Sequence, residues 1–364
     1  MQERPFWRRD GVAFVALVLC SFMPAAVIGE MAPANTLLID LSGAGIHGKA
    51  YSVTICGKET QARDLFGPAK VKWISLNASG QAACLFESRK DKRGALRMVR
   101  LDDTSDGAAR EVPEVPDDPR GALSPDGRRL CHRVTEGNTV TIRILHLNSG
   151  QSEDVFAIEG LISPVSWSPD GKKIAYYFVP EEEFTDDSYR VSVSGRVGDQ
   201  WKHKIVAGPS KACMRSAMRD LPPVWGPDGK VIVFEARYQD EERGAQTYLV
   251  RIDGTGLVRI AGHNSGPSSS PFHGGIAFSD SRQGVFVYNP NTRKKTKVLD
   301  KAGVFYPKFS KNGTLLAYSD SDGVIYVTNA DGSSPREIMD TGYPVATRRF
   351  HWQGKVLKDE AGDE

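Results

Sequence analysis

Imidazole and thiol groups are the side chains of this sequence that could bind a metal ion. The chain has seven histidines and five cysteines. It contains no H-x-x-x-H, H-E-x-x-H or CxxC pattern, the spacings that bring two such ligands to one ion. His273 and His351 are weak candidates, because each directly precedes a predicted turn, where its ring could equally hydrogen-bond the turn backbone. We therefore expect no metal site and no cofactor.

Serine and carboxylate chemistry is no more clearly indicated. A serine hydrolase would carry its nucleophile in a G-x-S-x-G elbow, which does not occur in this sequence. The acidic runs 181–187 and 240–242 fall in predicted loops, where charged runs are typical of solvated surface. No acid and base can be paired without positions in space, so the sequence identifies no catalytic residue.

A recurring phrase defines the elements that would position any of these residues. An aromatic residue or Leu and a small polar residue precede Pro-Asp-Gly or a variant of it, and an apolar strand follows, as in a strand-turn-strand unit. The glycines recur every 38 to 58 residues, a period typical of propeller blades, and an alternating hairpin lies between successive phrases. The copies are 76–80, 123–127, 167–171, 225–229, 272–275, 309–313 and 350–354.

The order of these units predicts how the chain closes. Residues 36–41, 50–55 and 61–65 would supply three strands of a last blade, and the segment around Phe350-His351-Trp352 would supply its innermost strand. The sequence thus predicts an all-β fold: a single β-propeller of four-stranded blades over residues 35–358, with seven blades and a closing blade shared by both chain ends. Six blades are the alternative, because the final phrase lacks Pro-Asp. Residues 359–364 are expected to be a disordered tail.

The strand after each phrase is predicted to be buried on both faces. Large residues occur three and five positions after the glycine, and small apolar residues occur between them at 84, 131, 175, 233 and 317. Four cysteines after the N-terminal segment would permit two disulfides. However, Cys84 and Cys131 fill the small core position, so we expect buried thiols there, and His132 fills a large core position.

The phrase, together with residues 324–335 (VIYVTNADGSSP), resembles the WD40-like (PD40) repeat of TolB-like β-propellers over nearly all of residues 36–357. The resemblance implies the fold. It leaves the activity open, because similar repeats occur in propellers attached to serine peptidases and in oligogalacturonate lyases. TolB also has an α/β domain before its propeller, and partner contacts made through that domain cannot be transferred to this chain.

Residues 1–30 have the order of a secretory leader. Arg4, Arg8 and Arg9 precede a 19-residue apolar run from Gly11 to Gly29. This run is close to the length that spans a bilayer, so an N-terminal membrane anchor is the alternative to a cleaved signal peptide. We expect a periplasmic or extracellular protein, with anchoring to the inner membrane as the second possibility.

The net charge is +2, which argues against nucleic acid as the partner, and we expect no concentrated basic surface.

The face opposite the Pro-Asp-Gly turns should collect the longest loops, among them the link 207–221, and long loops are often binding loops. The candidate binding residues are Lys211, Arg215, Arg219 and Arg348.

Three functions are consistent with these features. The leading hypothesis is an exported, monomeric, non-enzymatic propeller that binds another protein or a cell-envelope component. The second is a propeller enzyme, a lyase or hydrolase acting on polysaccharide at the channel mouth. The third is a purely structural repeat module.

Overall fold

The computed structural model describes the strands and most turns from residue 35 to residue 353. The described residues are 35–40, 50–56, 59–64, 71–76, 82–87, 95–100, 110–111, 121–183, 189–210, 222–236, 238, 246–262, 266–270, 274–280, 282–310, 312–341 and 350–353. Residues 34–364 form one compact unit. Among the described residues, no helix is both long and apolar enough to span a membrane. The leader and the tail predicted at the two ends lie outside the described residues.

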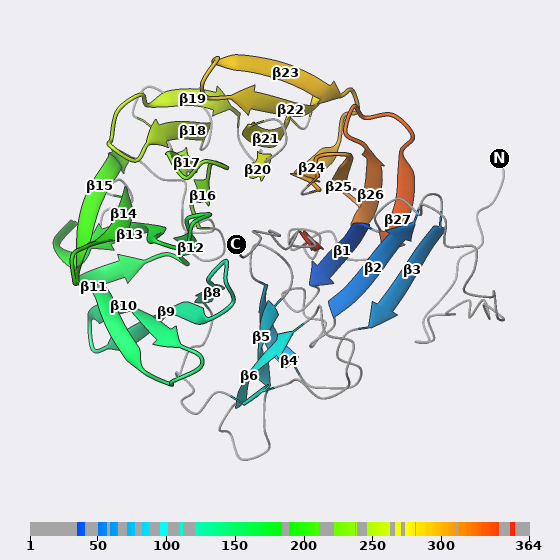
Figure 1. Cartoon of the computed structure of the whole chain (residues 1–364). Helices are drawn as coiled ribbons and strands as arrows, with labels where there is room; N and C mark the ends of the chain where they lie inside the picture. Colours follow the sequence, from blue (N-terminus) through cyan, green and yellow to red (C-terminus); the bar gives the residue numbers. More distant parts are fainter. Residues whose placement is uncertain are drawn as a thin grey trace, which may run out of the picture. The chain divides into compact units, whose positions relative to one another are not determined.

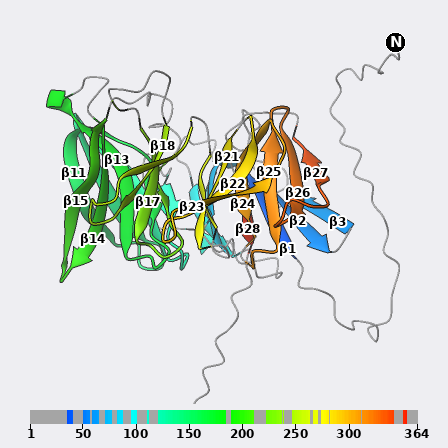
Figure 2. The same cartoon turned by 90° about the horizontal axis from the view of Figure 1, so that it is seen from above.

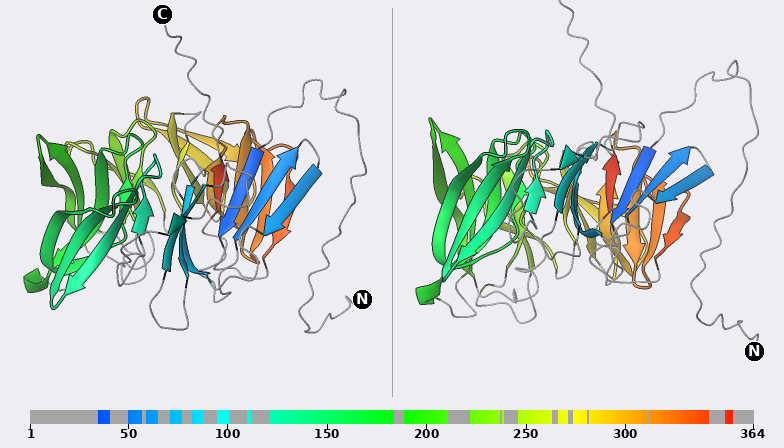
Figure 3. Two further views of the ribbon diagram at one scale, coloured as in Figure 1. Left: turned by 60° about the horizontal axis from the view of Figure 1, so that its bottom comes forward. Right: turned by 90° about the horizontal axis from the view of Figure 1, so that it is seen from below.

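The two ends of the propeller segment pair with each other, as predicted. The last strand pairs antiparallel with the first, with Leu37 opposite Trp352 and Ile39 opposite Phe350. Figure 3 shows the last strand in red beside the first in blue. The sheet has the order β28 (Phe350–Gln353), β1 (Asn35–Asp40), β2 (Ala50–Cys56), β3 (Glu59–Asp64).

The remaining strands form antiparallel sets of four in chain order. The third and second sets are joined, because the end of β11 also pairs with β13. The strands are β4 (Val71–Leu76), β5 (Ala82–Glu87), β6 (Ala95–Arg100), β7 (Arg110–Glu111); β8 (Gly121–Leu123), β9 (Arg129–Glu136), β10 (Thr139–His146), β11 (Ser152–Ile162); β12 (Ser166–Trp167), β13 (Lys173–Pro180), β14 (Tyr189–Val197), β15 (Gln200–Ser210); β16 (Val224–Trp225), β17 (Val231–Ala236), β18 (Gln246–Arg251), β19 (Val258–Ala261); β20 (Ser268–Ser270), β21 (Gly275–Asp280), β22 (Gly284–Asn289), β23 (Lys294–Leu299); β24 (Val304–Phe309), β25 (Leu315–Asp320), β26 (Val324–Asn329) and β27 (Arg336–Asp340). One 3-10 turn, Glu181–Glu183, follows β13.

The sheets lie side by side with their first strands innermost (Figures 1 and 2). Each first strand contacts the first strand of the next sheet, from β4 through β8, β12, β16, β20 and β24 to β28. The fold is therefore all-β, and this arrangement is consistent with the predicted propeller.

The Pro-Asp-Gly turns are held by a repeated hydrogen-bond pattern. In the turn after β8, the hydroxyl of Ser124 donates a hydrogen bond to the Asp126 carboxylate at 2.5 Å. The same hydroxyl accepts the backbone N–H of Arg129 at 2.9 Å. Ser168 with Asp170, and Ser310 with Asn312, repeat this pattern. Burial opposes ionisation of Asp126, but the hydrogen bonds from Ser124 and from the N–H of Arg128 outweigh it and lower its pKa. These polar side chains are therefore structural.

The predicted core positions are confirmed where side chains are described. Ile174, Ile232 and Leu316 are completely buried, and so are the small residues between the large ones, including Ala175 and Val233. Cys131 is a free thiol with no exposed surface, and burial raises its pKa far above the ordinary value. His132 is 3% exposed and belongs to the core. Both Cys131 and His132 therefore fill positions in the core and are not candidates for chemistry. The side chain of Cys84 lies outside the described residues.

Tryptophans of the innermost strands link neighbouring sheets. The indole N–H of Trp167 donates to the carbonyl of Ala122 at 2.8 Å, and that of Trp225 donates to Ser166 at 3.1 Å. Trp352 donates in the same way to Lys308 at 2.8 Å. The closing strand thus makes the contact that the clearest repeats make.

The predicted register is wrong for the last phrase. We assigned Phe350 to the aromatic position, but Trp352 makes the indole bond and pairs with the buried Leu37, as Trp167 pairs with Ile174. The strand that follows in the repeat is supplied by β1, so Leu37 fills the first buried position of that strand.

The phrase at 272–275 is also shifted. Ser269, and not Phe272, pairs with the buried residue Ile276. In both weak copies the absence of Pro-Asp removes the marker that fixes the register in the clear ones.

We expect Trp352→Phe to lower the free energy of unfolding by about 1 kcal/mol, because it leaves the Lys308 carbonyl without this donor while keeping most of the ring packing. Trp352→Ala should cost about 3 to 5 kcal/mol. Urea unfolding followed by circular dichroism measures both. Trp225→Phe removes the equivalent bond and is the matched control; a loss at Trp225 with no loss at Trp352 would contradict closure by the C-terminal strand.

Candidate functional site

Most predicted site residues lie outside the described part of the structure. This applies to Lys211, Arg215 and Arg219 in the link after β15, to Arg348, and to His273. His351 belongs to β28, where its backbone pairs with Leu38, but its side chain is not described. These assignments remain predictions. Within the described residues, no group of three or more His, Cys, Asp or Glu side chains could hold a metal ion.

One polar cluster fills the outer edge between β10–β11 and β14–β15. The Glu153 carboxylate forms an ion pair with Arg196, accepts the indole N–H of Trp201 at 3.2 Å, and lies 3.2 Å from Nε2 of His146. Burial opposes its ionisation, but these hydrogen bonds, that of Arg196 foremost, outweigh it and lower the pKa of Glu153. The Glu153 carboxylate is therefore engaged by three neighbouring side chains, and the cluster joins two sheets.

A histidine that the sequence analysis did not single out packs beside this cluster. The His203 ring stacks on Phe156 with centroids 4.2 Å apart, and its Nδ1 lies 2.8 Å from the hydroxyl of Tyr176. Burial lowers the pKa of His203, which favours a neutral ring. Its environment is that of a structural side chain.

The innermost strand β24 is irregular. A bulge interrupts its pairing with β25 between Phe305 and Lys308, and Tyr306 within it has a φ of 53°. Bulges of this kind redirect side chains and are frequent near binding sites. Burial lowers the pKa of Lys308 to about 8, so this lysine is the most strongly perturbed cation of the described residues.

A cleft of about 210 Å³ opens between the sheets β16–β19 and β20–β23. Three turns form its walls: the Pro-Asp-Gly turn after β16, the β18–β19 turn and the β22–β23 turn. Its floor is apolar and consists of Val231, Leu249 and Tyr288, all buried. Leu257 and Val258 line it as well, although they are 47% and 38% exposed. The cleft therefore lies at the same end of the sheets as the Pro-Asp-Gly turns.

A backbone hydrogen bond joins two of the turns that form the walls. The backbone N–H of Ile252 in the β18–β19 turn donates to the carbonyl of Lys230 at 3.0 Å. The equivalent bond joins Leu147 to Arg128 and Ala330 to Thr314 in other sheets, at 2.9 Å in each case. In these three sheets the outer turn is thus tied to the inner turn of its own sheet.

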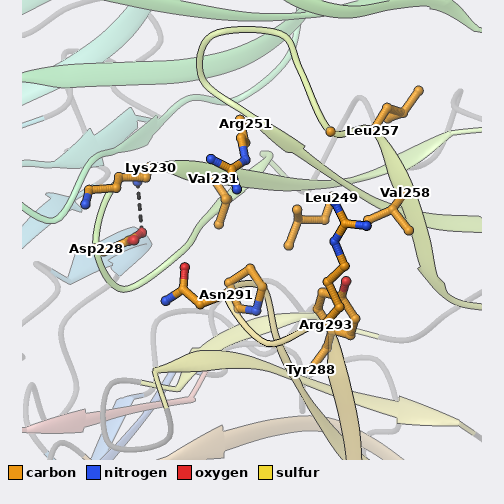
Figure 4. A pocket seen from close by; sticks show the side chains of 12 residues that line it. Asp228, Lys230, Val231, Leu249, Arg251, Leu257, Val258, Tyr288, Asn291 and Arg293 are labelled. Atoms are coloured by element: carbon orange, nitrogen blue, oxygen red, sulfur yellow. Dashed lines mark hydrogen bonds between the residues drawn. The ribbon is translucent and has the colours of Figure 1, made fainter.

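Three cations without an ion-pair partner among the described residues line this cleft: Lys230, Arg251 and Arg293. They come from three different turns or strand ends, and in Figure 4 the side chain of Lys230 extends outward at one edge. Within the described structure none of their side chains forms an ion pair or a side-chain hydrogen bond. Asp228 is the only acidic side chain among the lining residues, and its Oδ1 accepts the backbone N–H of Lys230 at 3.0 Å. The cleft thus has a net positive charge.

Arg293 has an unusual backbone conformation for its residue type. Its φ is 56°, in the left-handed region, which costs a side chain other than glycine on the order of 1 kcal/mol. The β10–β11 turn has the same length, with His146 bonded to Gln151 as Asn289 pairs with Lys294, and it carries Gly150 at the equivalent position with a φ of 74°. An arginine therefore occupies a position that turn geometry assigns to glycine.

The expectation of no concentrated basic surface is wrong for one edge. Strand β23 and the residues beside it carry Arg293, Lys294, Lys295, Lys297 and Lys301. The run Arg293-Lys294-Lys295-Thr296-Lys297 is visible in the sequence, but only the structure shows that it borders the cleft. Lys295 lies 4.2 Å from the centroid of Phe286, and Lys301 lies the same distance from that of Tyr326. These lysines cover aromatic pairs, and charged side chains also protect an edge strand.

We expect the stability of the protein to gain from Lys308 as pH rises from 8 toward 10. The pKa of this group is about 8 in the folded protein and 10.5 ordinarily, so the unfolded chain binds more protons in that range. Relative to Lys308→Met, the wild type should gain about 1 to 2 kcal/mol in free energy of unfolding between pH 7.5 and 9.5. Urea titrations at both pH values measure this. Parallel changes in both proteins would contradict the lowered pKa of Lys308.

Comparison with known proteins shows the fold. No family model matches the sequence, and no curated protein matches it. The structure is similar to TolB from Acinetobacter baumannii, with 13% identity, a TM-score of 0.51, and 90% of this chain and 68% of TolB covered. An oligogalacturonate lyase in complex with manganese has 14% identity and a TM-score of 0.56, with 88% and 90% covered. A puromycin-hydrolysing peptidase from Mycobacterium tuberculosis has 14% identity and a TM-score of 0.53, with 80% and 50% covered.

Identities this low carry no information about activity or ligand. The three proteins differ in what their names say they do, yet all share the arrangement of sheets. The chain therefore has a TolB-like β-propeller fold, as its repeat predicts.

Proposed function

We propose that this chain is an exported propeller that binds another protein or a component of the cell envelope. The observation that carries the proposal is the cleft between β16–β19 and β20–β23, where three unpaired cations surround an apolar floor. Residues that are neither paired nor buried contribute little to folding, and their convergence on one cleft is typical of a binding surface.

The size of the cleft favours a macromolecular partner. Pockets that enclose a small ligand usually have volumes of about 300 to 1,000 Å³, whereas this one has about 210 Å³. It can hold a few side chains of a larger partner. Leu257 and Val258 extend the contact beyond the cleft, because exposed apolar side chains beside a polar rim suit a protein surface.

We further propose that the propeller closes as seven blades, with β28, β1, β2 and β3 as the closing blade. The pairing of Leu37 with Trp352 and the indole bond of Trp352 support this count over six blades. Export rests on the leader-like order of residues 1–30, with the membrane anchor as its alternative. The link containing Lys211, Arg215 and Arg219, together with Arg348, is proposed as a second contact surface at the other end of the sheets.

Site-specific photocrosslinking tests the proposal. A photoreactive residue in place of Leu257 should capture one dominant protein or envelope component in cells of the native host. The matched control replaces Val197, which is 66% exposed and lies in β14, away from the cleft.

Equal capture at both positions, or none at either, would refute binding through this cleft. Capture only by a probe at Arg215 or Arg219 would move the contact to the link after β15. Shortening of an acidic oligosaccharide by the purified protein would favour the enzymatic alternative.

A further inference from the structure

We propose that the cleft recognises an acidic segment of a protein partner, in which carboxylates alternate with apolar side chains, and that the guanidinium of Arg293 is its principal carboxylate contact. The inference rests on the proposed function, since it names the chemistry of the partner at the same cleft.

The charge balance of the cleft calls for an anion. Lys230, Arg251 and Arg293 are left without ion pairs in the described structure, and Asp228 is the only lining carboxylate. Some cations elsewhere have acidic partners: Arg143 pairs with Asp154, and Arg190 with Glu183. Like charges gathered around one cleft repel each other, and an anionic ligand removes that repulsion.

The conformation of Arg293 points to this residue in particular. Glycine satisfies the β10–β11 turn at the equivalent position, so the left-handed geometry needs no side chain there. In the β22–β23 turn the arginine contributes no ion pair to the described structure, and its side chain lines the cleft instead (Figure 4). A strained residue that does not stabilise the fold is a candidate for function.

The chemistry of the lining favours a peptide over a free anion. A guanidinium can bind a carboxylate with two parallel hydrogen bonds. Leu257 and Val258, which are 47% and 38% exposed, offer contact to apolar side chains beside that carboxylate. Inorganic phosphate would leave this apolar surface unused. A uronic-acid oligosaccharide would do the same, and the one aromatic ring of the cleft, that of Tyr288, is only 7% exposed.

The test uses the purified full chain and a fluorescent peptide of alternating Asp and Leu residues, with the Asn-for-Asp peptide as control. Anisotropy should show binding of the acidic peptide, weakened by increasing salt, and much weaker binding of the amide peptide. Arg293→Gly should weaken binding about tenfold or more, while the melting temperature stays unchanged or rises, because glycine relieves the backbone strain.

Arg282→Ala is the matched control, because it removes one exposed charge from the same sheet at the β21–β22 turn. It should leave binding unchanged. Arg293→Lys keeps the positive charge but lacks the planar guanidinium that binds a carboxylate with two hydrogen bonds, so it should give an intermediate loss of affinity.

Wild-type affinity in Arg293→Gly, or equal binding of the acidic and amide peptides, would overturn the inference. Displacement of the peptide by millimolar inorganic phosphate, or by a uronic-acid oligosaccharide at lower concentration than by unlabelled peptide, would overturn it in favour of that ligand. If a partner is captured at Leu257 but its affinity is unchanged in Arg293→Gly, the proposed carboxylate contact is refuted and the proposed function is not. Peptide binding without any captured partner would refute the function alone.

Discussion

A serine hydroxyl holds the inner end of the sheet together at two of the three Pro-Asp-Gly turns, and Gly226 takes the place of the serine in the third. In both of these repeats it donates to the carboxylate two residues later and accepts the N–H of the residue that begins the second strand, as Ser168 does with Asp170 and Lys173. This pair of bonds fixes the reversal between the innermost strand and the strand buried on both faces.

The same turns connect one sheet to the next and leave a specific set of groups for function. Arg129 donates to the carbonyl of Gly171 in the next turn at 2.9 Å and lies over the ring of Trp167. The indole bonds of Trp167, Trp225 and Trp352 add a second row of contacts. The conspicuous Ser and Asp residues of the repeat are therefore engaged in structure. The cations that line the cleft, Lys230, Arg251 and Arg293, form no ion pair within the described part of the chain.

The fold could be predicted from the sequence because its main signal is local and repeated. Turn chemistry and the spacing of apolar residues identified the strands that are buried on both faces, and they correctly placed Cys131 and His132 in the core. The register failed where the local marker is missing: Trp352 and Ser269 occupy the positions assigned to Phe350 and Phe272. Strand pairing decides such cases, and a single phrase without Pro-Asp does not encode it.

The cleft could not be predicted, because it depends on which cations remain unpaired once two sheets meet. Lys230, Arg251 and Arg293 are distant in sequence, and nothing in their local patterns distinguishes them from Arg143 or Arg190, which have acidic partners. The left-handed φ of Arg293 is likewise visible only in the folded turn. The basic run 293–297 was a signal in the sequence, but it marked the whole edge strand and not the one residue that enters the cleft.

The central claim is that a carboxylate of the partner meets the guanidinium of Arg293. A double-mutant cycle measures this contact directly, with Arg293→Gly on the protein and an acid-to-amide change on the peptide. A coupling energy of about 1.5 to 3 kcal/mol is expected for a hydrogen-bonded charged pair. A coupling energy near zero, with both single changes additive, would contradict the account.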